Sequence, residues 1–441
     1  MKPIPALQRI ARWIRADALR RQSLLLLATA PIGHAANLLY QWAMMRGLDH
    51  GQYGILSALS GAALTLLYPL EALRVALAAQ IARKAATGAG TSDLSRTAAR
   101  WAGGLALVAL MLIAGGFASA SALSQGLSLS APHGIPLAAA MMATGMYVPW
   151  IAGLLQGAEA FGWFTLSAQA FAVTRCALSV VGVFGRSATA EVVLLAHVIA
   201  AGCSVAIGWF GWSRVRRRFE PARPLAASRA DESAMADLRG FLAAVPSLLA
   251  FGVLMHADVV VSKIGLSAAA AGVFARAALI ARATVFLSMP VALAAFPRIA
   301  AGTATGLDIR PIWRRAATYT TGLILLAVAG LWVFGPLLWH GLTGQRPSTY
   351  EVALVRAMTL AAAPLGGVFL HIHLLLAAAR WKASLGIVPC AAAYVALAAT
   401  RRSDSIGMIA MLALASWTAL VILTLASTIS ARRERLKDLK G

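Results

Sequence analysis

The sequence predicts an all-α integral membrane protein with about twelve transmembrane helices, arranged as two six-helix bundles. Mean hydropathy is +0.75 over 441 residues, of which 60% are hydrophobic and 12% charged. Apolar runs of about twenty residues, the length that crosses a bilayer, recur along the chain. These runs lack the two-residue alternation of a membrane β-barrel, and hydrocarbon requires backbone polar groups to be paired within the segment.

Changes in hydropathy locate the expected spans along the chain. The first six are 22–45, 52–80, 98–121, 134–155, 161–185 and 189–212, and the last six are 240–263, 269–297, 314–338, 351–378, 383–400 and 406–430. Pro31 and Pro246 occupy matching places in the first and seventh spans. We therefore expect parallel repeats related by a pseudo-two-fold axis along the membrane normal.

One long polar segment divides the chain. It predicts an N-terminal bundle over residues 1–213, a basic cytoplasmic linker over 214–239, and a C-terminal bundle with a basic cytoplasmic tail over 240–441. The net charge of +23 first suggests a nucleic-acid binder. With the N-terminus inside, however, 28 of the 39 lysines and arginines fall in inner segments, 6 in outer segments and 5 within spans.

This bias predicts a multi-pass protein of the bacterial cytoplasmic (inner) membrane with both termini in the cytoplasm, and it makes nucleic acid an unexpected partner. The three cysteines are isolated in apolar segments, which predicts neither a disulfide framework nor a metal site. The outer loops contain no combination of nucleophile and base. We expect no catalytic residues and no cofactor.

Five arginines lie within the expected spans: Arg74, Arg175, Arg276, Arg282 and Arg356. Each costs about 2.5–3.5 kcal/mol near the centre of a membrane helix. Two local explanations apply first, because Arg356 lies near the outer end of its span and Arg74 follows Glu71 by three residues, as in a helical ion pair.

Arg175 and Arg282 are harder to explain locally. Each lies roughly fourteen residues, or about 20 Å, into its span, which is too deep for the side chain to reach the near surface. Arg276 lies nearer the outer end of the span that contains Arg282. Only two acids, Glu71 and Asp258, lie clearly within the expected spans, away from their ends, against the five arginines. We expect Arg175, Arg276, Arg282 and, less directly, Arg74 to line a cavity that binds phosphate or pyrophosphate.

Asp258 has two interpretations. It is a candidate site for a coupling proton or ion, or it pairs with Lys263 or with an arginine of the following span. The sequence leaves both open.

Two passages resemble the oligosaccharide flippases of the polysaccharide transporter family, within the multidrug/oligosaccharidyl-lipid/polysaccharide superfamily. They are NLLYQWAMMRGLDHGQYGILSAL at 37–59, and a second-half counterpart that contains Asp258, Lys263, AGVFARAALIAR at 271–282 and FPRIA at 296–300. Phe274 departs from the tyrosine that is frequent at that place in the family.

The resemblance implies two bundles around a cationic cavity and alternating access. It implies the flipping of a lipid-linked (polyprenyl-pyrophosphate) oligosaccharide with an anionic head group for polysaccharide biosynthesis, with membrane lipid and a glycan polymerase as partners. One alternative is a cation-coupled exporter of the multidrug and toxin extrusion type. Such exporters usually have an acid on the first span, where this sequence has only His34, Asn37 and Gln41 as polar candidates. Another is an integral-membrane glycan polymerase or ligase, although the outer loops are short.

Overall fold

The computed structural model describes residues 18–86, 91–127, 129, 133–185, 188–219, 227–305, 308–378, 380–400 and 404–438. Within these ranges the regular elements are helices, without a strand. Eleven helical segments of this part are long and apolar enough to cross a membrane, and α2 is a further helix of 30 residues. The prediction of an all-α membrane protein with about twelve spans is confirmed.

The helices follow the expected order. The first half contains α2 (Ala18–Gly47), α3 (His50–Leu67), α4 (Leu70–Ala86), α5 (Thr91–Ala118), α6 (Ala120–Gly126), α7 (Gly134–Gly145), α8 (Tyr147–Gly157), α9 (Phe161–Gly185), α10 (Ala190–Val215) and the 3-10 turn η1 (Arg216–Arg218). The second contains α11 (Ala227–Gly265), α12 (Ala268–Ala281), α13 (Ala283–Thr305), α14 (Arg310–Thr343), α15 (Thr349–Ala377), α16 (Trp381–Ser384), α17 (Ile387–Thr400) and α18 (Ser405–Asp438). Because α11 begins at Ala227, part of the segment expected as a linker is helical. The domain limits stay a prediction.

Several expected spans consist of two helices each. A break at Tyr68 and Pro69 separates α3 from α4, and a break at Arg282 separates α12 from α13. Proline at the first break lacks a backbone N–H and clashes with the preceding turn, which explains the interruption. By contrast, α2 and α11 continue through Pro31 and Pro246. Both breaks lie next to charged side chains.

Local sequence signals fix the ends of several helices. Asp49 caps α3 by accepting from the backbone N–H of Gln52, at 2.8 Å. Ser348 and Glu351 form a capping box at the start of α15. Gly344 ends α14 in the left-handed conformation with φ 77°, which glycine adopts without a steric penalty.

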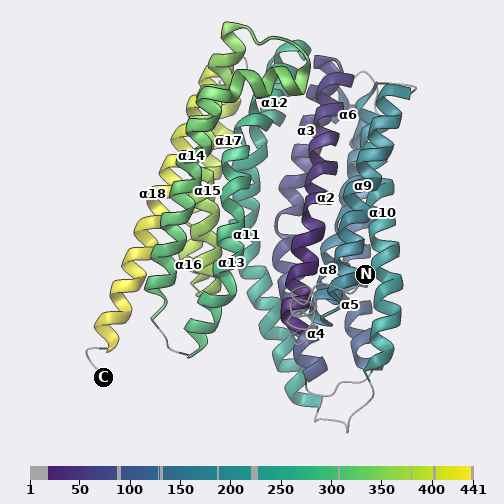
Figure 1. The fold of residues 1–441 in the computed structure, drawn as a ribbon, viewed down its shortest axis with the longest axis vertical. Helices are drawn as coiled ribbons and strands as arrows, with labels where there is room; N and C mark the ends of the chain where they lie inside the picture. The colour runs from purple at the N-terminus through teal and green to yellow at the C-terminus, as the bar shows by residue number, and fades with distance from the viewer. Residues whose placement is uncertain are drawn as a thin grey trace, which may run out of the picture.

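The two halves form two groups of helices that meet along α3, α11 and α12 (Figure 1). In the first half α9 packs on α2 and α10, and in the second half α15 packs on α13, α14 and α18. Between the halves, α3 packs on both α11 and α12. The largest hydrophobic core cluster includes residues of both groups. Toward the end of the molecule where α18 finishes, the ribbons of α14 and α18 diverge from α4 and α5 (Figure 1).

The contact between α3 and α12 depends on two glycines. A Cβ added at Gly272 would overlap the carbonyl oxygen of His50, and one at Gly54 would lie 3.2 Å from the backbone nitrogen of Gly272. The backbones of the two halves therefore touch at this end of the molecule, which is the outer end in the predicted topology.

Replacement of Gly272 by alanine should destabilise the protein by about 1–3 kcal/mol, because the new methyl group meets backbone that must move. Gly322→Ala in α14 is the matched control, since a Cβ there meets nothing within 4 Å. Thermal unfolding in detergent micelles should show a lower midpoint for the first variant and an unchanged or higher midpoint for the second. Equal midpoints would contradict the close approach.

Candidate functional site

The predicted site residues lie on four helices and have separate sets of partners. Arg74 lies on α4, Arg175 on α9, Asp258 on α11, and Arg276 on α12, with Arg282 at the C-terminal cap of α12. What distinguishes the four arginines is the group that balances each charge.

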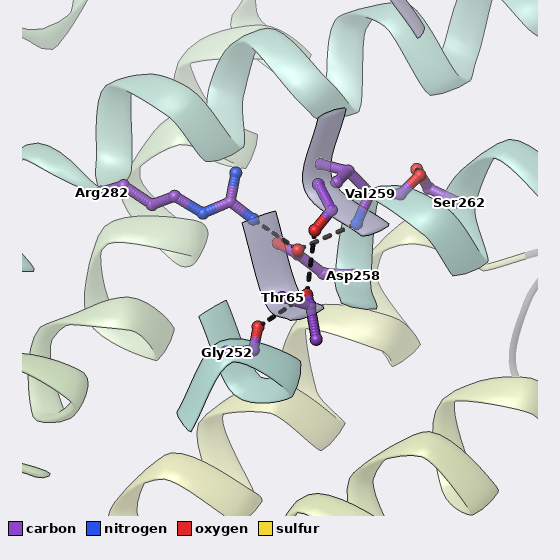
Figure 2. A network of polar contacts seen from close by, with 7 residues as sticks. Thr65, Gly252, Asp258, Val259, Ser262 and Arg282 are labelled. Carbon is purple, nitrogen blue, oxygen red and sulfur yellow. Dashed lines mark hydrogen bonds and ion pairs between the residues drawn. The ribbon is translucent and has the colours of Figure 1, made fainter. Parts of the chain in front are cut away.

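Arg282 is paired with a buried carboxylate. Its Nη2 donates to Oδ1 of Asp258 at 2.5 Å, and the two side chains are 9% and 2% exposed. The same oxygen accepts from the backbone N–H of Val259 at 2.9 Å. Figure 2 shows the guanidinium reaching from the end of α12 to the carboxylate on α11. Of the two interpretations of Asp258, the structure shows the pair with an arginine of the following span, and not with Lys263. A coupling role stays a prediction.

Helix α3, in the first half of the chain, contacts α11, the helix that contains Asp258. The Thr65 hydroxyl donates to the Gly61 carbonyl at 2.9 Å and lies 3.1 Å from the Gly252 carbonyl of α11 (Figure 2). The pair therefore lies beside the junction of the two halves. An arginine and an aspartate buried together are costly to separate, since each would remain as an uncompensated charge.

Arg74 is paired with an exposed carboxylate. Its Nε donates to Oε2 of Glu71 at 2.9 Å and its Nη1 to Oε1 of Gln156 at 2.5 Å. The Glu71 side chain is 56% exposed and that of Arg74 20%. The local ion pair expected from their spacing is present. Exposed pairs of this kind contribute only about 0–1 kcal/mol, so another anion can replace the glutamate.

Glu71 is an exposed acid within a candidate membrane span, 50–78. An exposed carboxylate facing hydrocarbon would be expensive, whereas one facing the opposite half can be hydrated. That the Glu71 side of α4 faces a hydrated space between the halves stays a prediction.

Arg175 has no carboxylate partner among the described residues. Its Nη2 donates to Oδ1 of Asn37 on α2 at 2.6 Å, and its guanidinium carbon lies 4.3 Å from the Tyr40 ring centroid and 5.2 Å from that of Phe171. Its buried Nε has no hydrogen-bond partner in the described part of the chain. Aromatic faces and one amide attract a cation but do not neutralise it. Arg175 thus keeps a full positive charge and an unused donor.

Arg276 is held by backbone of the other half. It is 3% exposed, and its Nη2 donates to the carbonyls of Met45 at 2.9 Å and Leu48 at 3.0 Å. Its Nη1 lies 2.7 Å from Nδ1 of His50, and its guanidinium carbon 5.2 Å from the Tyr53 ring centroid. Carbonyls at a helix C-terminus carry partial negative charge, which favours a guanidinium there. Its predicted contact with an anion stays a prediction.

The sequence did not predict three partners of the arginines: Gln156 for Arg74, Asn37 for Arg175 and His50 for Arg276. His50 had one available signal, because it is a rare ionisable group in the short outer loops. Among the described residues no group of three histidines, cysteines or acids could hold a metal ion.

Neither a model of a protein family nor a curated protein matches the sequence. Solved structures do match. An inward-facing multidrug resistance MATE family transporter of the MOP superfamily superimposes with a TM-score of 0.70 at 13% identity, over 90% of this chain and 96% of that chain. Lipid II flippase MurJ in an inward closed conformation gives 0.66 at 10% identity, over 92% and 87%. An outward-facing MATE transporter of the same superfamily gives 0.57 at 14% identity, over 95% and 98%.

At these identities the matches show the fold alone. The chain is a multi-pass, all-helical membrane protein that shares its fold with these solved structures. The predicted fold class is confirmed. The matched proteins are transporters and a flippase, not enzymes.

The two ion pairs should differ in their effect on stability. Asp258→Ala leaves the buried Arg282 without a counter-charge and should cost about 3–5 kcal/mol of unfolding free energy. Glu71→Ala removes an exposed partner and should cost at most about 1 kcal/mol. Denaturation in detergent micelles measures both.

The double variant Asp258→Leu/Arg282→Met is the control, because removing both charges together should recover much of the loss. Similar losses of unfolding free energy for Asp258→Ala and Glu71→Ala would contradict the expectation that the buried pair contributes more to stability than the exposed pair.

Proposed function

We propose that this protein flips a lipid-linked (polyprenyl-pyrophosphate) oligosaccharide across the bacterial cytoplasmic membrane for polysaccharide biosynthesis, by alternating access between its two halves. The observation that carries the proposal is the charge balance of the interior. Arg175 has no acid partner among the described residues, and Arg74 has one that is exposed and exchangeable.

These two arginines suit a phosphate-bearing head group. A guanidinium donates two parallel hydrogen bonds to a phosphate, and each charged hydrogen bond contributes about 1.5–3 kcal/mol. When the head group binds Arg74, Glu71 is displaced as counter-ion but remains beside it and favours later release. Binding that is strong enough for entry and weak enough for exit is what transport requires.

The other two arginines have structural tasks in this proposal. Arg282 neutralises Asp258 beside the junction of the halves, and Arg276 holds the outer contact of α12 with α2 and α3. The oligosaccharide follows the hydrated side of α4 between the halves, while the polyprenyl tail stays in the bilayer.

The topology and partners belong to the same proposal. Both termini lie in the cytoplasm, residues 1–213 and 240–441 move as the two bodies, and a glycan polymerase on the outer side receives the cargo. The bias of lysine and arginine between inner and outer segments supports this orientation.

A multidrug exporter is the second candidate, favoured by the TM-score of 0.70 with a multidrug resistance transporter. Two features oppose it. Helix α2 contains no aspartate or glutamate over Ala18–Gly47, and the interior charges are mainly positive, which repels organic cations.

Replacement of Arg175 or Arg74 by alanine should weaken head-group binding roughly tenfold to a hundredfold and reduce flipping correspondingly. Flipping by Arg175→Lys should be intermediate between that of the wild type and that of Arg175→Ala, because lysine keeps the charge but cannot donate two parallel hydrogen bonds. Arg356→Ala is the matched control, because that arginine donates to the Trp332 carbonyl within the second half. The measurement is the flipping of a fluorescent polyprenyl-pyrophosphate oligosaccharide in proteoliposomes, with ethidium uptake measured in parallel.

Unchanged flipping by both alanine variants, at wild-type levels of folded protein, would exclude these arginines from cargo binding. Transport of ethidium without transport of the lipid-linked glycan would favour the multidrug exporter.

A further inference from the structure

The two halves are joined at the outer end by contacts that transport must open. Arg276 of α12 donates to the end of α2, and Gly272 packs against the backbone of His50. From the first half, Arg46 donates through Nη2 to the Gly341 carbonyl of α14 at 3.3 Å. We call these contacts the outer gate.

One contact of the outer gate depends on a proton. A guanidinium has donors only, so the 2.7 Å contact between Nη1 of Arg276 and Nδ1 of His50 requires a lone pair on that nitrogen. The contact therefore exists only when Nδ1 carries no proton. Unlike the two backbone carbonyls that Arg276 also binds, the imidazole of His50 can take up a proton in mild acid and so lose its acceptor.

Protonation would place an imidazolium against a buried guanidinium. Arg276 is 3% exposed, whereas His50 is half-buried and open to water. The other groups facing this contact are Asp49, which precedes α3, Glu351 on α15, and the phenol of Tyr53 beside Arg276.

Both acids have other hydrogen bonds. Asp49 accepts from Gln52, and Glu351 accepts from the backbone N–H of Ser348 at 2.6 Å. Among the described residues neither forms an ion pair with His50. The contact that protonation changes most is the one with Arg276, and that change is repulsive.

We propose that His50 is a proton-binding latch of the outer gate: neutral His50 holds Arg276 and keeps the gate closed, and a proton from the outer side releases Arg276 and favours opening. The inference rests on the proposed movement of two halves but not on the identity of the cargo. The two carbonyl contacts of Arg276 persist, so the proton shifts the equilibrium between closed and open molecules without abolishing the closed form.

The experiment measures the outer distance between the halves directly. Ala188, before α10, and Thr400, at the end of α17, are both exposed and lie at the outer end in the predicted topology. Each is replaced by cysteine and spin-labelled, after Cys176, Cys203 and Cys390 are changed to alanine. Electron double resonance on the full chain in lipid nanodiscs, without cargo, then gives the distance distribution between about pH 5 and pH 8.

With His50 present, acid should raise the population of the longer distance, by at most about tenfold in the open-to-closed ratio per pH unit for one proton. His50→Gln keeps a hydrogen-bond acceptor that does not titrate, so its distribution should stay closed at both pH values. His50→Lys carries a fixed positive charge, so it should show the raised population of the longer distance at both pH values.

The proposal would be overturned if the distance distribution of the protein with His50 did not change with pH. It would also be overturned if the His50→Gln variant opened in acid to the same extent. If His50→Lys fails to fold, the pH response of the His50→Gln variant still tests the proposal. Because the measurement contains no cargo, its failure leaves the cargo assignment intact. Loss of flipping by Arg175→Ala likewise does not bear on the latch.

Discussion

A charge inside hydrocarbon must be balanced or hydrated, and this constraint organises the interior of the protein. The four arginines meet it in four ways: Arg282 with a buried carboxylate, Arg74 with an exposed carboxylate, Arg276 with backbone carbonyls, and Arg175 with an amide and two aromatic rings. In the proposed function, the kind of partner decides the task of each arginine. A buried pair resists separation, an exposed pair exchanges, and a cation without an acid attracts an anion.

The helix breaks place these charges. The interruption at Tyr68 and Pro69 starts a new helix, α4, whose first turn contains Glu71. The interruption at Arg282 ends α12 where its guanidinium reaches Asp258 on α11 (Figure 2). A continuous helix would fix both side chains by its 3.6-residue period. A break allows the second segment to change direction, so the charged group can face the junction of the halves.

Small residues and backbone contacts close one end of the junction, while the ribbons of α14 and α18 diverge from α4 and α5 at the other (Figure 1). The closed end joins α12 to the turn between α2 and α3 through directional hydrogen bonds and close backbone contact. Directional contacts between two packed bodies are made or lost as a unit. This property suits a gate that has a closed and an open form.

The sequence alone determined the features that depend on local spacing. The number and order of the spans follow from the length of apolar runs, and the pair of Glu71 and Arg74 follows from a three-residue separation on one helix. The sequence also predicted which arginines lie within spans. For Asp258 it allowed two kinds of partner, Lys263 or an arginine of the following span. Only the tertiary structure decided the remaining partners. Arg276 meets Met45 across 231 positions, and Arg175 meets Asn37 across 138, because the packing of separate helices brings them together. Hydropathy reports the depth of a residue in the membrane, but not the face of the helix on which it lies or its neighbours there. The partners of the four arginines therefore became distinct only in the folded molecule.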